Sequence, residues 1–201
     1  MTQLLEIGQA GLPFAGESEI GDRCVVRLSD QRALVAVIDG VGHGHEAAAA
    51  SAAAAEVLER YGNETLDVLM LRCHENLVDT RGAAITLTLF DGRNSVLHWL
   101  GAGNVAALLL HTEPSGHARA RELLVRSGVA GVSLPSIDVS STAVARGDLV
   151  VLATDGLRPD FAEGVDRCAR PQVLAERLLA DYGTRRDDAL VVVARLIGSP
   201  A

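Results

Sequence analysis

Two segments of this sequence bring an aspartate to the end of an apolar run. Residues 33–40 are Ala-Leu-Val-Ala-Val-Ile-Asp-Gly, and residues 148–156 are Asp-Leu-Val-Val-Leu-Ala-Thr-Asp-Gly. Each run is long enough for one buried strand, and Asp39 or Asp155 comes where that strand must end. If both strands belong to one sheet and end at the same edge, the two carboxylates converge, and they repel each other unless protons or cations neutralise them. The pattern predicts a metal site.

Further acidic residues border other expected strands. Asp22 follows Gly21, and the pair Asp187-Asp188 directly precedes the last apolar run. Mg²⁺ and Mn²⁺ prefer carboxylate, carbonyl and water oxygens, and a glycine after an aspartate lets a backbone carbonyl turn inward as a further ligand. Two such ions about 3.5–4 Å apart hold a bridging water and activate it for attack on a phosphoryl group. These residue types therefore indicate phosphate-ester hydrolysis.

Histidines and arginines close to these acids are candidates for substrate contact. His43 and His45 lie in a glycine-rich turn and at a helix start, where they act as metal ligands or acid catalysts, or only line the site. Arg185 and Arg186 precede the last aspartates, and they either bind a substrate phosphate through two hydrogen bonds or stay solvated. The three cysteines are widely spaced and form no Cys-x-x-Cys pair, which indicates reduced thiols.

Helices and strands occur in separate groups along the chain. An alanine-rich run predicts a helix over residues 45–61, ended by Gly62-Asn63, and further helices are expected over 64–77 and 171–181. Strands are expected over 4–8, 24–28, 33–39, 84–90, 95–100, 105–111, 122–126, 139–144, 149–153 and 190–197. Because Asp-Gly is also a common turn dipeptide, Asp91-Gly92 is interpreted only as a hairpin turn. Hairpin-connected strands favour an antiparallel α+β sandwich over an alternating βαβ fold.

Composition narrows the class of protein. The chain has 201 residues, 48% of them hydrophobic, and no linker divides it, which predicts one domain over residues 1–201. A net charge of −8 without a basic patch argues against nucleic-acid binding. The apolar runs are too short to cross a membrane, so we expect a cytoplasmic protein. All 18 basic residues are arginine, which excludes mechanisms that need a lysine amine.

Five short motifs, taken in order, resemble those of a known family. They are Gly21-Asp22, residues 38–44 (Ile-Asp-Gly-Val-Gly-His-Gly), 101–104 (Gly-Ala-Gly-Asn), 153–157 (Ala-Thr-Asp-Gly-Leu) and 187–189 (Asp-Asp-Ala). This set is similar to the motifs of the metal-dependent, PPM-type serine/threonine protein phosphatases, and most of all to their bacterial SpoIIE-like branch. The short chain and the segment Arg81-Gly82-Ala83-Ala84 resemble the stressosome feedback phosphatases of that branch.

The resemblance implies a fold and a set of ligands. The fold is an αββα sandwich whose two antiparallel sheets carry two Mn²⁺ or Mg²⁺ ions at one edge. Asp39 would bridge both ions, while Asp22 and the carbonyl of Gly40 would complete the coordination. Asp155 and Asp187 would hold the second ion. Asp39 and Asp22 are thereby the aspartates that the resemblance assigns to catalysis.

One position departs from the family pattern. The family usually has threonine three residues after the last ligand, and this chain has Leu190. Either Asp187 or Asp188 is therefore the last ligand, and we favour Asp187.

The resemblance also implies the reaction. It is hydrolysis of phosphoserine or phosphothreonine on STAS-domain proteins of a stressosome or partner-switching system, by metal-activated water. Two other classes of function are open to the sequence. A catalytically inactive, phosphatase-fold binding module would have no use for retained, mutually repelling acids. A receiver-type phosphoacceptor domain needs a parallel sheet and a lysine, whereas this chain has hairpins and only arginine.

Overall fold

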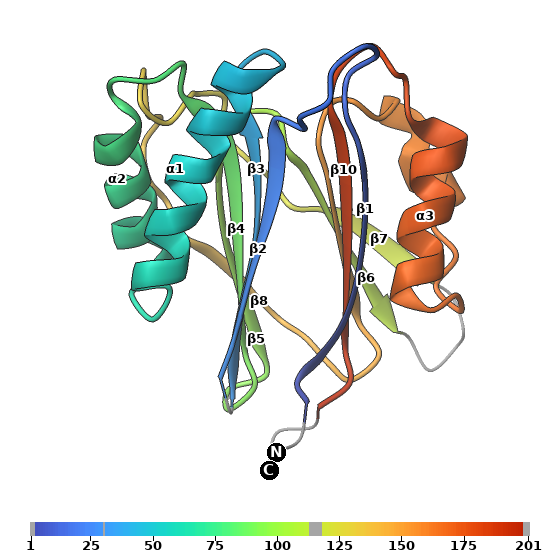
Figure 1. The fold of residues 1–201 in the computed structure, drawn as a ribbon. Coiled ribbons are helices and arrows are strands. Elements are labelled where there is room, and N and C mark those ends of the chain that lie inside the picture. The colour runs from blue at the N-terminus through green and yellow to red at the C-terminus, as the bar shows by residue number, and fades with distance from the viewer. Residues whose placement is uncertain (1–2, 30, 113–117, 199–201) are drawn as a thin grey trace.

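Two antiparallel sheets packed face to face form the centre of the molecule, and helices cover their outer faces (Figure 1). The computed structural model describes residues 3–29, 31–112 and 118–198. One sheet has the strand order β1-β10-β9-β6-β7, and the other has the order β2-β3-β4-β5-β8. This arrangement confirms the predicted α+β class and the αββα sandwich.

The strands and helices of the described residues have these bounds. The strands are β1 Leu5–Leu12, β2 Asp22–Leu28, β3 Arg32–Gly40, β4 Ala83–Asp91, β5 Val96–Ala102, β6 Ala106–Thr112, β7 Ala118–Glu122, β8 Ser140–Ala143, β9 Leu149–Ala153 and β10 Ala189–Leu196. The helices are α1 His45–Tyr61, α2 Leu66–Leu77 and α3 Pro171–Tyr182, with a short 3₁₀ helix η1 at Pro159–Gly164.

Strands in the middle of each sheet are apolar throughout because both of their faces are buried. In β9, Val150 and Leu152 pack between the two sheets, whereas Leu149 and Val151 pack toward α3. Strand β3 alternates in the same way between the inter-sheet core and the core under α1 and α2. This explains why the sequence shows continuous apolar runs here rather than an alternation of apolar and polar residues.

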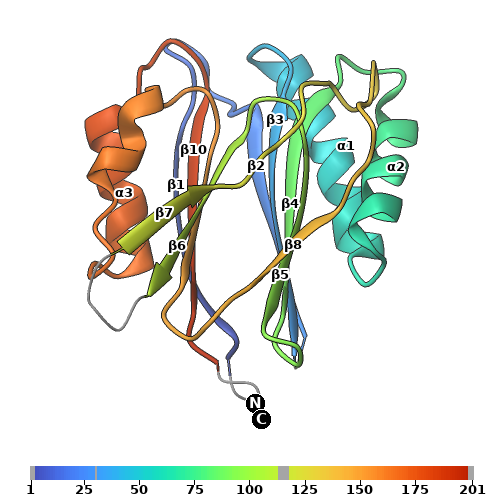
Figure 2. The same ribbon diagram turned by 180° about the vertical axis from the view of Figure 1, so that it is seen from behind.

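The helices lie in separate layers. Helices α1 and α2 cover the sheet of β2 and β3, and α3 covers the sheet of β1 and β10, as the view from behind also shows (Figures 1 and 2). The alanine-rich sequence lets α1 approach its sheet closely, since a Cβ atom on Gly40 would lie 2.1 Å from the carbonyl oxygen of Ala47. Helix α1 is thus held tightly against the end of β3.

The structure decides three points of the sequence analysis. The condition that β3 and β9 share one sheet is not met, because they belong to the two different sheets of the sandwich. The strand expected over 122–126 is wrong in position, because β7 ends at Glu122 and the following residues form the connection past β5. Asp22, which borders the strand expected over 24–28, is the first residue of β2. Among the described residues, no helix is long and apolar enough to span a bilayer.

Candidate metal centre

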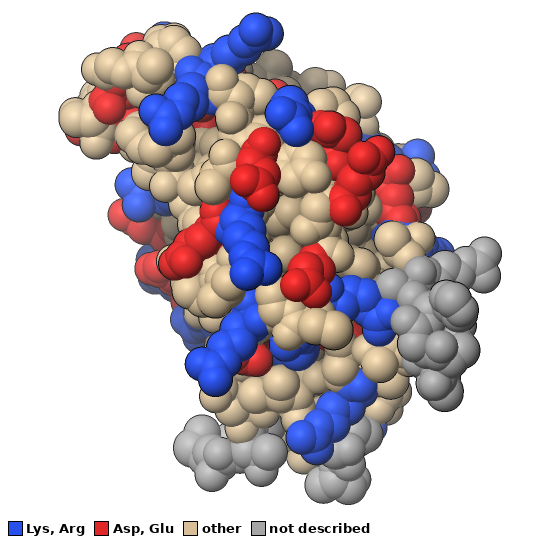
Figure 3. Space-filling view, turned by 90° about the vertical axis from the view of Figure 1, so that its right-hand side faces the viewer, with Lys and Arg blue, Asp and Glu red and all other residues tan. Residues whose placement is uncertain are grey.

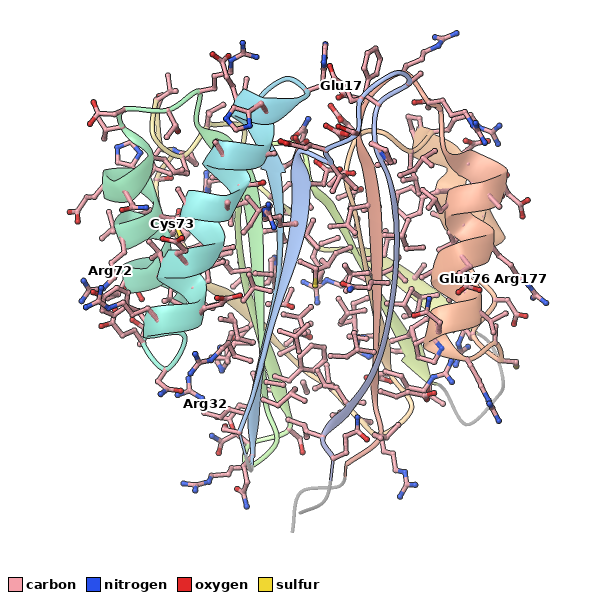
Figure 4. The ribbon with its side chains drawn as sticks, viewed as in Figure 1. Glu17, Arg32, Arg72, Cys73, Glu176 and Arg177 are labelled. Carbon is pink, nitrogen blue, oxygen red and sulfur yellow. The ribbon has the colours of Figure 1, made fainter. Side chains whose placement is uncertain are left out.

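The strand ends that carry the aspartates meet at one edge of the sandwich, opposite the chain termini (Figure 1). Glu17, labelled in Figure 4, marks this edge, and Arg32 marks the opposite one. A cavity of about 390 Å³ opens at this edge and has Asp39, Asp155 and Asp187 in its lining. The three aspartates come from the end of β3, the end of β9 and the start of β10.

Strand register explains why these carboxylates converge although they belong to two sheets. In β3, Val35 and Val37 point their side chains between the sheets. Asp39 is two residues after Val37 and therefore lies on the same face of the strand. Asp22 is the cross-strand partner of Asp39. The pleat therefore directs both carboxylates from one sheet toward the ends of β9 and β10 in the other.

Thr154 joins the two sheets at this point. Its hydroxyl donates a hydrogen bond of 2.8 Å to Oδ2 of Asp22 and accepts one of 2.8 Å from the backbone N–H of Leu190. Asp22 is 3% exposed, and this hydroxyl satisfies one of its buried oxygens. Thr154 belongs to the motif 153–157, but no role was predicted for it from the sequence.

Burial and the closeness of the aspartates raise the pKa values of these carboxyl groups when no cation is bound. Burial, followed by repulsion from Asp22 and Asp155, raises the pKa of Asp39 to about 8. Burial also raises the pKa of Asp22 to about 7, against the hydrogen bond from Thr154 that lowers it. A pair of divalent cations would reverse this situation, because positive charge favours the ionised form.

Asp155 stands at the exposed side of the cavity and is oriented by a residue that sequence reasoning missed. The side-chain amide of Asn104 donates a hydrogen bond of 2.6 Å to Oδ2 of Asp155. Desolvation and Asp187 raise the pKa of Asp155, and the hydrogen bond from Asn104 opposes them. Asn104 also lines the cavity. Its signal in the sequence was its place at the end of the motif Gly-Ala-Gly-Asn.

The structure gives the two adjacent aspartates different surroundings. Asp187 lines the cavity, and its Oδ1 accepts a hydrogen bond of 2.9 Å from the backbone N–H of Asp188. Asp188 is 3% exposed, and its Oδ1 accepts a hydrogen bond of 2.8 Å from the backbone N–H of Phe14. Its Oδ2 is buried, and no described residue donates a hydrogen bond to it. Asp188 thus holds the loop before β2, whereas Asp187 faces the cavity.

The residues proposed for substrate contact lie outside the cavity lining given by the described residues. His43 stacks on Phe14 with the ring centres 4.4 Å apart, and its Nδ1 lies 3.2 Å from Glu17. Arg185 and Arg186 are exposed in the loop before Asp187. The structure therefore brings Asp22, Asp39, Asp155 and Asp187 together with Gly40, but leaves these three side chains at the periphery.

The residues present fit a hydrated divalent cation. In the part of the chain that the structure describes, no three His, Cys, Asp or Glu side chains form a group that could hold an ion by themselves. Mg²⁺ keeps several waters and is commonly held by one or two carboxylates, so a complete protein cage is not required. The all-oxygen set, the raised pKa values and the buried oxygen of Asp188 that lacks a donor all favour added positive charge.

Comparisons with known proteins agree on one family. The family model of SpoIIE, Stage II sporulation protein E, matches residues 29–197. The phosphoserine phosphatase RsbX of Bacillus subtilis (strain 168) is 25% identical over 182 residues, which cover 90% of this chain and 89% of RsbX. A crystal structure of RsbX in complex with magnesium superposes with a TM-score of 0.85 and 25% identity, covering 98% of this chain and 97% of that one.

Two further solved structures share the fold. A chain from a study of the bacterial stressosome, a modular system adapted to control secondary messenger signalling, has a TM-score of 0.86 and 30% identity, covering 95% of this chain and 99% of its own. The catalytic domain of the serine/threonine protein phosphatase PstP, in complex with two manganese ions, has a TM-score of 0.70 and 16% identity, covering 98% of this chain and all of that one. At 16% identity, the similarity to PstP shows only a common fold.

Proposed function

This chain belongs to the SpoIIE family, and we propose that it is a metal-dependent phosphoserine/phosphothreonine protein phosphatase that forms a single domain over residues 1–201. The observation that carries the proposal is the convergence of Asp39, Asp155 and Asp187 on one cavity, with Asp22 buried behind them. The similarity to the phosphoserine phosphatase RsbX supports it.

The aspartates are assigned to two ions, Mn²⁺ or Mg²⁺. Asp39 would be shared by both, with Asp22 and the carbonyl of Gly40 at the first ion and Asp155 and Asp187 at the second. When bound, such ions lower the pKa of water, neutralise phosphate oxygens and orient the substrate for in-line attack.

The protein's own contribution is to hold its carboxylates in place. Asp39 and Asp22 are fixed at the ends of paired strands, so their positions depend on the rigid sandwich rather than on a loop. Thr154 orients Asp22, and Asn104 orients Asp155. Partners of this kind fix the direction of the ligand oxygens and raise metal affinity.

We infer that the substrate is a phosphorylated STAS-domain protein of a stressosome or partner-switching system, encountered in the cytoplasm. Similarity to RsbX and to the stressosome chain supports this substrate class. The site is an open cavity at the sandwich edge, so much of the specificity would come from docking of a folded partner. Binding energy remote from the phosphate then positions the phosphoryl group.

The alternative of an inactive binding module is disfavoured by the electrostatics. Burial and mutual repulsion raise the pKa values of Asp22 and Asp39 to about 7 and about 8, which destabilises the metal-free fold near neutral pH. A module that only binds a partner would gain stability by replacing one of these acids.

The experiment compares kcat/KM on three substrates with Mn²⁺ present: a phosphorylated STAS-domain protein, its isolated phosphopeptide and p-nitrophenyl phosphate. We expect the folded protein to be cleaved best and all activity to disappear with a chelator. Chelator-insensitive hydrolysis would refute the metal mechanism. Equal cleavage of peptide and folded protein would refute docking as the source of specificity.

A further inference from the structure

One wall of the cavity has a chemistry that hydrolysis does not explain. Asp39, Asp155 and Asp187 form the acidic part of the lining, and the rest combines the polar Asn104 and Ser127 with glycines and with the apolar Val41, Ala84 and Val129. The apolar groups cannot hold cations or phosphate oxygens. They would instead fit an apolar side chain that lies next to the phosphorylated residue.

Gly82, part of the segment 81–84 singled out in the sequence, assembles this wall. Its carbonyl accepts a hydrogen bond of 3.0 Å from the backbone N–H of Val41. Its φ is +80°, and an added Cβ would lie 2.7 Å from a methyl group of Val129 and 3.1 Å from one of Val132. Gly82 therefore lies next to two separate segments, one with Val41 and one with Val129 and Val132, and Val41 and Val129 line the cavity. We call Val41, Val129 and Val132 the valine rim.

The rim is solvent-exposed, although it is apolar. Val132 is 66% exposed and Val41 is 39% exposed, while Val129 is half-buried between them and the cavity. Next to Gly82, Arg81 forms an ion pair with Glu46 of α1. The outer face over α3 differs, since acidic and basic side chains are intermixed across it (Figure 3).

The segment that carries Val129 and Val132 is rigidly held. Ala130 and Ala83 exchange two backbone hydrogen bonds of 2.9 and 3.0 Å. The backbone N–H of Gly131 donates a hydrogen bond of 2.9 Å to Nδ1 of His74 on α2. The N–H of Val129 donates one of 2.9 Å to the carbonyl of Ser133. A surface fixed in this way loses little conformational entropy when a partner binds.

We propose that the valine rim is a substrate-docking surface, which binds a phosphoprotein through an apolar side chain adjacent to its phosphoserine or phosphothreonine. The proposal rests on the proposed phosphatase function. Its occupant follows from continuity with the catalytic cavity, because Val41 and Val129 line the same cavity as the three aspartates and so lie beside any phosphorylated residue bound there.

The test uses two phosphoserine peptides that differ only in the residue beside the phosphoserine, which is Leu in one and the uncharged, polar Asn in the other. With Mn²⁺ present, the wild-type protein should cleave the Leu peptide with a kcat/KM about tenfold higher, through KM. Val132→Lys should abolish or reverse this preference and leave hydrolysis of p-nitrophenyl phosphate unchanged. Leu28→Lys is the matched control, because Leu28 is 53% exposed at the far end of β2.

Each outcome separates the docking surface from the proposed function. If the wild-type protein with Mn²⁺ hydrolyses neither peptide, nor p-nitrophenyl phosphate, nor a phosphorylated STAS-domain protein, the proposed function fails and the rim loses its basis. If hydrolysis occurs but the two peptides are cleaved equally, only the rim proposal is overturned. It is also overturned if Val132→Lys lowers activity on both peptides and on p-nitrophenyl phosphate equally, since the residue would then shape the cavity. Unchanged preference in Leu28→Lys supports the rim, and a matching loss there contradicts it.

Discussion

Replacing Asp39 by asparagine should abolish turnover and stabilise the metal-free protein at the same time. The carboxylate is shared by both proposed ions, so its loss removes a ligand of each. Without metal, however, the same carboxylate is a buried charge that faces Asp22, Asp155 and Asp187. An amide of the same shape carries no charge and escapes that repulsion.

The magnitude follows from the pKa of Asp39, which burial and repulsion raise from 3.8 to about 8. A difference of about 4 pKa units, at about 1.4 kcal/mol each, corresponds to about 5 kcal/mol of lost stability when the group is fully ionised. Part of this energy is relieved when Asp22 stays protonated, so we expect a gain of about 2–4 kcal/mol at pH 8. For a chain of this size, that raises Tm by about 5–15 °C.

The assay is thermal unfolding in chelator at pH 8 and near pH 4. A carboxylate with a raised folded-state pKa weakens the fold progressively as pH rises from 3.8 toward about 8, so the advantage of Asp39→Asn should be present at pH 8 and nearly absent at pH 4. A lower Tm for the variant at pH 8, or an equal gain at both pH values, would refute the electrostatic reasoning.

Three further predictions test the supporting residues. Thr154→Val removes the hydroxyl that donates a hydrogen bond to the buried Asp22 and should lower the free energy of unfolding by about 1–3 kcal/mol, measured by urea denaturation. Asn104→Ala frees Asp155 and should weaken Mn²⁺ binding by about tenfold in calorimetry while the fold persists; unchanged affinity would contradict its orienting role. Iodoacetamide should modify the exposed Cys168 and leave activity intact, because burial raises the pKa of the other two thiols to about 12.

The convergence of Asp39 and Asp155 was predicted from the sequence, but the assignment of their strands to two different sheets was not. An apolar run buried on both faces looks the same in either sheet of a sandwich, so the sequence cannot assign β3 and β9 to different sheets. The position of Asp39 in β3 makes its carboxylate point inward, because it lies on the same face of the strand as Val35 and Val37. Only the pairing of the strands reveals that direction.

Other features depend on contacts between distant segments and left little trace in the sequence. Thr154 bonds to Asp22 across 132 positions of the chain, and Gly131 bonds to His74 across 57. The strand expected over 122–126 is displaced because β7 is built from alternating Ala and Arg, which hides its strand character. By contrast, β9 and α1 match their predicted bounds, since a strong apolar run and an alanine-rich run each favour one local structure.

The most direct test of the central claim is a Mn²⁺ titration by calorimetry, with phosphate release measured on the same samples. It compares the wild-type protein with Asp39→Asn and with Asp91→Asn. Asp91 is another aspartate followed by glycine, but it lies at the β4–β5 turn and not at the cavity. We predict that wild type and Asp91→Asn bind Mn²⁺ and release phosphate alike, whereas Asp39→Asn loses both. Undiminished Mn²⁺ binding or turnover in Asp39→Asn would contradict the assignment of this edge as the metal centre.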